Sequence, residues 1–240
     1  MQNISKNVEK SLLICYDKKH IRRDFFMKNM LGIVVSCIYI GIIIVSAKFF
    51  EKAGKEASRK YIHIMLSNWW IIAMAFFDNP IWASVLPFIF IIINYYSYKK
   101  DFISVMERSN QDGLGTVYYA GSLLFMTIYT FGIIKNPLIG LVSILIMGYG
   151  DGLACVIGRT VKSHEYLIGK TKKTIAGSAT MLVVSFIILS VFLAYLGINL
   201  WYLKALILSI IITVIEAISI KGTDNLTVPI ITSILVTFLV

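Results

Sequence analysis

The chain has 240 residues, of which 58% are hydrophobic and only 15% are charged. Soluble domains carry charge on about a quarter of their residues, so this composition excludes an ordinary soluble domain and indicates an integral membrane protein. The formal charge of +10 suits loops that lie against anionic lipid, and we expect no nucleic-acid partner. The three cysteines show no CxxC spacing, which argues against a disulfide framework or a cysteine metal site.

The first segment, residues 1–28, is polar and basic. We expect it to be either a loosely ordered tail or an amphipathic helix on the membrane surface. No small-residue cleavage site follows the first apolar run, so the segment does not resemble a cleaved signal peptide. Residues 29–240 are expected to form a single transmembrane domain.

Apolar stretches then recur along the rest of the chain. A membrane-spanning helix needs about 20 largely apolar residues. The sequence predicts seven or eight such helices, at 30–50, 61–77, 80–97, 115–134, 137–157, 175–196, 200–220 and 226–240. The stretches lack the alternation of a membrane barrel, so the predicted fold class is an all-α, multispan integral membrane protein.

Charge is distributed unevenly between the connecting loops. With eight spans, the loops after the first, third, fifth and seventh hold nearly all of the loop charge, including Lys52, Lys55, Arg59, Lys60, Lys99, Lys100, Arg108, the 159–173 cluster and Lys221. The positive-inside rule places these loops in the cytosol and makes the chain a multi-pass protein of the cell membrane.

The first polar motif is RKYIHI, residues 59–64. Arg59 and His63 are four residues apart and share one helix face. Arginine suits phosphate recognition through its planar fork, and histidine can bind phosphate or relay a proton. Arginine and lysine at a helix start with a hydrogen-bonded histidine would explain the same pattern without a site.

The second motif surrounds Asp151, which interrupts an apolar run between Gly150 and Gly152. A carboxylate near membrane depth is costly and usually functional. Mg²⁺ prefers one or two carboxylates together with substrate oxygens, so Asp151 is a candidate metal ligand. The glycines allow a close approach of the backbone.

A basic loop follows, with Arg159, Lys170, Lys172 and Lys173 leading into a helix expected to begin at about Thr174. Lysines, backbone amides and the helix dipole together form an anion site there, although a solvated charge run is the plainer interpretation. The triplet GKT at 169–171 is not a P-loop, because position 164 is histidine and no strand precedes it.

The last motif is EAISIKGTDNLTVPI, residues 216–230. Glu216 lies inside an apolar stretch, and Asp224 and Asn225 follow at its exit. Glu216 is a candidate second metal ligand, a general base, or a carboxylate paired with Arg59 or Lys60. A structural ion pair at the membrane boundary is the alternative.

In this order, the stretches RKYIHI, LGTVYY, GDGLACVIGR, KTKKTIAGS and EAISIKGTDNLTVPI resemble the polyprenol kinase family, which includes phytol kinases, dolichol kinases and CTP-dependent diacylglycerol kinases. The resemblance extends from residue 59 to about residue 230. It implies a transmembrane catalytic domain that transfers the γ-phosphoryl group of a nucleotide triphosphate, commonly CTP, to a lipid alcohol in the membrane.

Residue by residue, the resemblance implies three roles. The catalytic residues would be Asp151, His63 and Glu216, and Mg²⁺ would be held by Asp151, Asp224 and Glu216. The nucleotide and phosphate groups would be bound by Arg59, Lys60, Gly150, Gly152, Arg159, Lys170, Lys172, Lys173, Gly177, Ser178 and Asn225.

Two other functions remain open from the sequence. The family is similar to phosphatidate cytidylyltransferases, which use CTP to transfer a cytidylyl group. A transporter for an anionic solute would also place acidic residues in membrane helices, but it predicts inverted repeats, and none is evident. The sequence identifies neither the acceptor lipid nor the oligomeric state.

Overall fold

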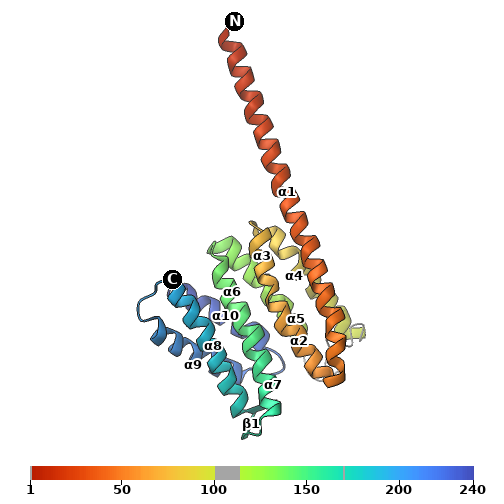
Figure 1. Cartoon of the computed structure of the whole chain (residues 1–240), viewed down its shortest axis with the longest axis vertical. Helices are drawn as coiled ribbons and strands as arrows, with labels where there is room; N and C mark the ends of the chain where they lie inside the picture. The colour runs from red at the N-terminus through yellow and green to blue at the C-terminus, as the bar shows by residue number, and fades with distance from the viewer. Residues whose placement is uncertain (1, 101–113, 170) are drawn as a thin grey trace.

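The computed structural model describes residues 2–100, 114–169 and 171–240 (Figure 1). Within these ranges, side chains are described from residue 23 onward, except at positions 53, 55 and 100. The expected tail at 1–28 therefore lies largely outside the described side chains, and its membrane contacts stay a prediction. Lys170 also lies outside the described residues.

The described chain is helical apart from one short hairpin. In chain order its elements are α1 (Gln2–Phe50), η1 (Glu51–Ala53), α2 (Lys55–Ser67), α3 (Trp69–Phe76), α4 (Pro80–Lys100), α5 (Gly115–Met126), η2 (Thr127–Ile133), α6 (Pro137–Leu145), η3 (Ile146–Asp151), α7 (Gly152–Thr160), β1 (Glu165–Ile168), β2 (Thr171–Thr174), α8 (Ile175–Tyr195), α9 (Trp201–Ile218) and α10 (Asp224–Thr237).

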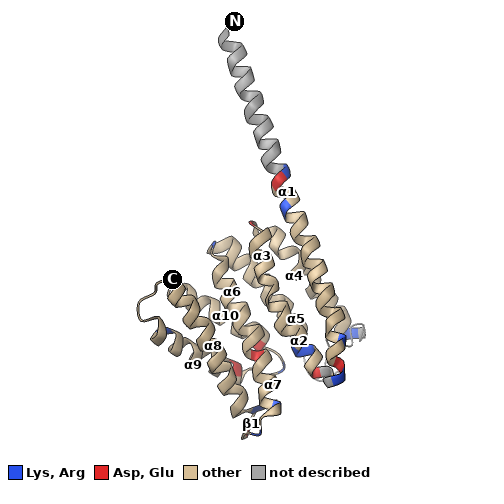
Figure 2. Ribbon diagram, in the orientation of Figure 1, with Lys and Arg blue, Asp and Glu red and all other residues tan. Residues whose placement is uncertain are grey.

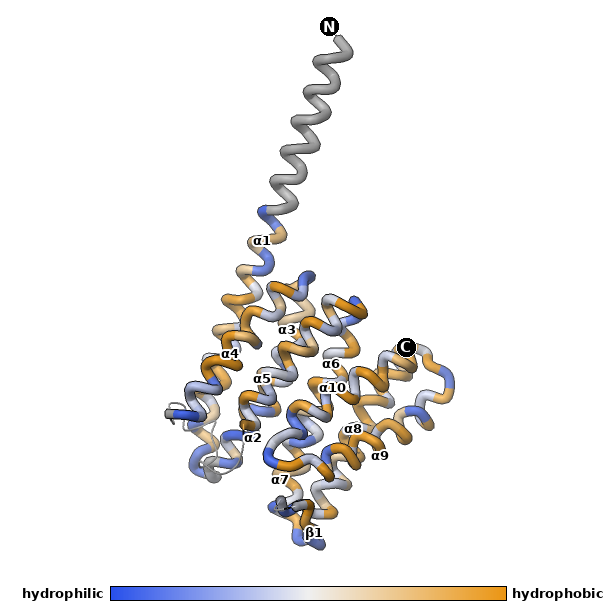
Figure 3. Tube along the Cα trace, turned by 180° about the vertical axis from the view of Figure 1, so that it is seen from behind, coloured by the Kyte–Doolittle hydropathy of each residue, from blue (hydrophilic) through white to orange (hydrophobic). Residues whose placement is uncertain are grey.

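The helices form one bundle with an apolar outer surface (Figures 1 and 3). α1 packs on α2 and α3, α4 packs on α5, and α8 packs on both α7 and α9. α10 fills the centre, against α5, α6 and α9. The prediction of an all-α multispan membrane protein is confirmed.

Six helical stretches of the described chain are long and apolar enough to cross a bilayer. They are 23–50, 80–99, 115–133, 137–160, 175–195 and 201–218. The other two expected spans are built from shorter helices. The 61–77 stretch divides at Asn68 into α2 and α3, and the last stretch is α10, which has 14 residues.

Charged side chains gather at one end of the bundle (Figure 2). This end contains the start of α2, the end of α7 and the β1–β2 hairpin. At the opposite end, Lys28 Nζ lies 2.7 Å from Asp78 Oδ2. The described parts of the loops that the sequence groups by charge therefore lie together; Arg108 lies outside the described residues, and the side of the membrane that these loops face stays a prediction.

Two features of the α6–α8 region were not predicted. The segment from Ile146 to Asp151 is a π-helical turn, η3, which continues the helix through the glycines instead of breaking it. The basic loop contains an antiparallel hairpin in which Tyr166 pairs with Lys173 and Leu167 with Lys172. The expectation that no strand precedes the triplet at 169–171 was therefore wrong, because β1 ends at Ile168. Because side chains alternate along a strand, the two lysines point to opposite faces.

The glycines of η3 and α7 allow neighbouring helices to pack closely. A Cβ atom on Gly148 would overlap the Ser67 side chain on α2, and one on Gly152 would overlap Ile64. A Cβ on Gly150 would meet the sulfur of Met181 on α8. The segment that bears Asp151 is therefore held tightly between α2 and α8.

We predict that Gly148→Ala lowers the melting temperature of the detergent-purified protein. Overpacking of this kind typically costs about 1–3 kcal/mol, and each kcal/mol lowers the melting temperature by about 2–4 °C in a chain of this size. The matched control is Gly121→Ala on α5, where nothing lies within 4 Å of the added carbon. Equal melting temperatures for the two variants would contradict the close packing.

Candidate active site

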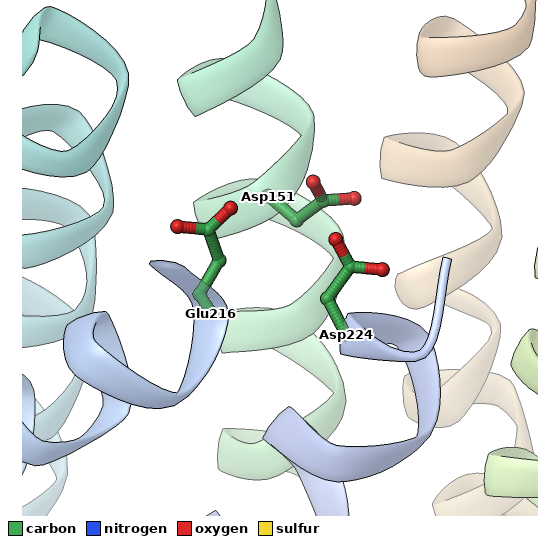
Figure 4. A group of neighbouring side chains, drawn as sticks. All are labelled: Asp151, Glu216 and Asp224. Carbon is green, nitrogen blue, oxygen red and sulfur yellow. The ribbon is translucent and has the colours of Figure 1, made fainter. Parts of the chain in front are cut away.

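Three carboxylates meet inside the charged half of the bundle. One oxygen each of Asp151, Glu216 and Asp224 lies within 4.8 Å of the others. Figure 4 shows the three side chains converging from separate elements: η3, the last turn of α9 and the first turn of α10. Asp151 and Glu216 are buried. Such a cluster is costly in a membrane protein unless cations compensate it.

A tight turn between α9 and α10 brings Glu216 and Asp224 together. Lys221 and Gly222 adopt positive φ angles of 52° and 81°. A Cβ on Gly222 would lie 2.8 Å from the Cα of Gly115, so the turn presses against the start of α5. Asn225 secures this contact, because its Nδ2 donates to the Gly115 carbonyl oxygen at 2.9 Å.

Two lysines pair with the carboxylates; Lys60 is buried and Lys173 is half-buried. Lys60 Nζ donates to Asp151 Oδ2 at 2.6 Å. Lys173 donates to both the carboxylate and the backbone carbonyl of Glu216, and its Nζ lies 3.8 Å from Asp224 Oδ2. Burial opposes the charged form of Lys173, but the carboxylates of Glu216 and Asp224 outweigh it and raise the lysine's pKa.

His63 lies next to the same cluster. Its Nε2 is 3.2 Å from Asp151 Oδ2 and 3.2 Å from the Met147 carbonyl oxygen. Both neighbours are hydrogen-bond acceptors, so we assign the proton of the neutral ring to Nε2, which leaves Nδ1 as an acceptor. The ring of Tyr119 packs edge-on against His63 at 4.7 Å between centroids.

Arg59 is hydrogen-bonded to Glu56, which lies on the same helix. Its Nε donates to Glu56 Oε2 at 3.1 Å, and a second donor of the guanidinium reaches Glu56 Oε1. Arg159, at the end of α7, lies 3.4 Å from the same Glu56 oxygen. The two arginines predicted to bind phosphate thus meet at one carboxylate, at the rim of the cluster.

The remaining predicted phosphate-binding residues occupy several positions. Lys172 is exposed and lies 3.3 Å from Glu165 Oε2, on the face of the hairpin opposite Lys173. Thr174 caps α8 by accepting from the Gly177 amide at 3.1 Å, which confirms the predicted helix start. Ser178 Oγ lies 2.6 Å from the Tyr166 hydroxyl.

The structure corrects one partner and adds others. Glu216 pairs with Lys173, and not with Arg59 or Lys60. Sequence reasoning missed Glu56 and Tyr119, which contact Arg59 and His63 respectively. Their positions offered a usable signal, because Glu56 precedes Arg59 by three residues and Tyr119 belongs to the quoted stretch LGTVYY.

The carboxylate cluster has the chemistry of a divalent cation site. Its ligands are hard oxygens, as Mg²⁺ requires. Glu216 Oε2 is buried and has no hydrogen-bond partner among the described residues, which is unfavourable unless a further group binds there. The residues therefore fit a magnesium ion held by Asp151, Glu216 and Asp224.

The known proteins that this chain resembles in sequence are named phytol kinases or probable phytol kinases. The phytol kinase of Synechocystis sp. is 28% identical over 216 residues, which cover 83% of this chain and 87% of the relative. The probable chloroplastic phytol kinase of Triticum aestivum is 28% identical over 208 residues, covering 77% of this chain and 67% of the relative. Chloroplastic phytol kinase 1 of Arabidopsis thaliana is 28% identical over 201 residues, covering 74% and 64%. No family model and no solved structure matches.

We predict that Lys173→Met destabilises the protein in metal-free solution and that divalent cations restore part of the loss. Removing one partner of a buried ion pair typically costs about 3–5 kcal/mol. Lys172→Met is the matched control, because that side chain is exposed on the same strand. The measurement is the melting temperature with and without Mg²⁺ or Mn²⁺. If cations raise the melting temperature of neither variant, the carboxylates do not form a cation site.

Proposed function

Because its phytol kinase homologues support assignment to the polyprenol and phytol kinase family, we propose that the chain is a membrane lipid kinase that phosphorylates a lipid alcohol. The observation that carries this proposal is the buried carboxylate cluster beside His63. Phosphoryl transfer is catalysed mainly by positioning the substrates and neutralising charge, and this cluster supplies groups for both.

The proposed phosphate donor is a nucleoside triphosphate, and the family resemblance favours CTP. Asp151, Glu216 and Asp224 would hold Mg²⁺, which neutralises charge on the phosphate oxygens when bound. Lys60 and Lys173 lie within hydrogen-bonding distance of these carboxylates and would face the same oxygens. Arg59 and Arg159 lie at the rim, where the phosphates or the nucleoside would enter.

His63 is the proposed general base. In the step that we propose, the acceptor hydroxyl oxygen forms a bond to the γ-phosphorus, and the bond from that phosphorus to the β–γ bridging oxygen breaks. The nucleoside diphosphate leaves, and the hydroxyl proton passes to Nδ1 of His63. Asp151 would stabilise the resulting imidazolium, because its Oδ2 lies 3.2 Å from Nε2.

Two alternatives predict different products. A phosphatidate cytidylyltransferase would transfer the α-phosphorus with its nucleoside and release pyrophosphate. A transporter would transfer no label to lipid. In the described part of the chain, the polar groups cluster toward one end of the bundle, whereas a transporter would place them at mid-depth in paired broken helices.

We predict that the protein in detergent with Mg²⁺ transfers label from γ-labelled, but not α-labelled, CTP to a lipid alcohol such as phytol. ATP and phosphatidate are tested in parallel. Asp151→Asn should reduce transfer on the order of a thousandfold, equivalent to about 4 kcal/mol of barrier. The control is Asp78→Asn, which changes an exposed aspartate at the end of the bundle opposite the carboxylate cluster. This variant should transfer label at the unchanged rate. Label from the α-position would establish cytidylyl transfer, and no label in lipid from either would favour transport.

We also predict that His63→Asn lowers kcat by about 10²–10⁴-fold with little change in the KM for nucleotide. Asparagine retains a hydrogen-bond donor but cannot accept the hydroxyl proton at physiological pH. The steady-state rates are measured at saturating acceptor. A variant with wild-type kcat would exclude His63 as the base and transfer that role to a carboxylate.

A further inference from the structure

A pocket of about 700 Å³, counted with its open mouth, lies beside the carboxylate cluster. Three helices, α2, α4 and α5, contribute most of its wall, with single residues from α1, α3 and α10. Its lining residues are Ile40, Arg59, Ile62, His63, Leu66, Trp69, Leu86, Pro87, Phe90, Asn94, Gly115, Thr116, Tyr119, Ala120, Leu123 and Asn225.

The pocket is polar at one end and apolar at the other. On α2 the lining changes from Arg59 and His63 to Leu66. On α5 it changes from Thr116 to Leu123, and α4, which runs the opposite way, changes from Leu86 to Asn94. All three helices therefore place their polar lining residues at the same end of the pocket. This polar end lies at the charged end of the bundle.

The polar end opens on the proposed reaction centre. His63 forms part of the pocket wall and lies 3.2 Å from Asp151 Oδ2. Asn225 lines the pocket and directly follows Asp224. Its Nδ2 is fixed by the Gly115 carbonyl, while its Oδ1 is buried without a hydrogen-bond partner among the described residues. An unpaired acceptor at this place fits a ligand that carries a hydroxyl group.

The apolar part is shallow compared with a membrane. From His63 to Trp69, or from Thr116 to Leu123, the helix rise amounts to about 10 Å. The hydrocarbon core of a bilayer is about 30 Å thick. The pocket therefore accommodates the first part of a lipid chain, and the rest of a long chain must leave it for the surrounding lipid.

Both α1 and α4 contribute to the pocket wall. At the end of the bundle far from the carboxylates these helices meet, and the rings of Phe26 and Trp82 are 5.7 Å apart. Nearer the carboxylates, Ile40 of α1 and Phe90 of α4 line the pocket instead. The apolar side chains that flank this stretch are exposed, as expected for lipid contact; they are Ile38, Ile42, Phe88, Ile89, Ile92 and Ile93.

We propose that the acceptor alcohol enters between α1 and α4 and places its first carbons in this pocket. Its hydroxyl then lies at the polar end, donates to Asn225 Oδ1 and faces Nδ1 of His63. Ala120 and Leu123 set the space available beside the chain, so they govern which acceptors fit. This inference rests on the proposed kinase function for the identity of the bound lipid.

The kinetic test narrows the pocket with Ala120→Leu. We expect the KM for the acceptor alcohol to rise at least tenfold, while the KM for nucleotide stays within twofold. Ala205→Leu is the matched control, because Ala205 is equally buried but lies on α9, away from the pocket. The melting temperatures of both variants are measured as well, since overpacking destabilises by itself. An unchanged acceptor KM in Ala120→Leu would overturn the proposal.

A second test does not depend on activity. A lipid alcohol with a photoreactive diazirine near its hydroxyl is irradiated with the protein, and labelled peptides are identified by mass spectrometry. We expect labels on α2, α4 and α5 at pocket residues such as Phe90 and Leu123, removed by excess unlabelled alcohol. Labelling elsewhere only would refute the pocket. Pocket labelling without phosphoryl transfer would retain the binding site and refute the kinase.

Discussion

The structure depends on the balance of charge around three clustered carboxylates, two of them buried and the third, Asp224, half-buried. Asp151, Glu216 and Asp224 face two lysines, Lys60 and Lys173, so one negative charge remains uncompensated among them. Arg59 and Arg159 both contact Glu56 at the rim, where two positive charges face one carboxylate. The rim therefore carries the excess positive charge and the centre the excess negative charge. An anion is attracted to the rim, and a divalent cation is attracted to the centre.

Helix α2 links the two halves of the proposed site. Lys60 points to Asp151, while Arg59 and His63 line the pocket, all within little more than one turn. The close contacts of Gly148 and Gly152 with α2 hold this turn against the segment bearing Asp151. A shift of α2 would therefore alter the proposed acceptor site and the carboxylate cluster together.

Much of the site was predictable because ionisable residues in apolar stretches are conspicuous. Asp151 and Glu216 have few reasons to occupy membrane helices other than function, and the motifs around them gave the family resemblance. The ion-pair partners of these two carboxylates were harder to predict from the sequence. Lys173, and not Lys172, reaches Glu216 because of the register of a hairpin that a short basic loop does not reveal. At the division of a predicted span, the Asn68 side chain contacts Tyr149, which lies 81 positions away in the chain and so gives no local signal.

The proposed entry of the acceptor between α1 and α4 has a consequence for the solvent in which the reaction is measured. Moving a methylene group from hydrocarbon into water costs about 0.8 kcal/mol, so ten methylenes cost about 8 kcal/mol. A chain that passes sideways from bilayer to pocket avoids this cost, because it never leaves an apolar phase. The effective concentration of acceptor is then its mole fraction in the membrane or micelle. In the proposed reaction, dilution with inert lipid or detergent would slow the transfer, whereas adding buffer at a fixed lipid ratio would not.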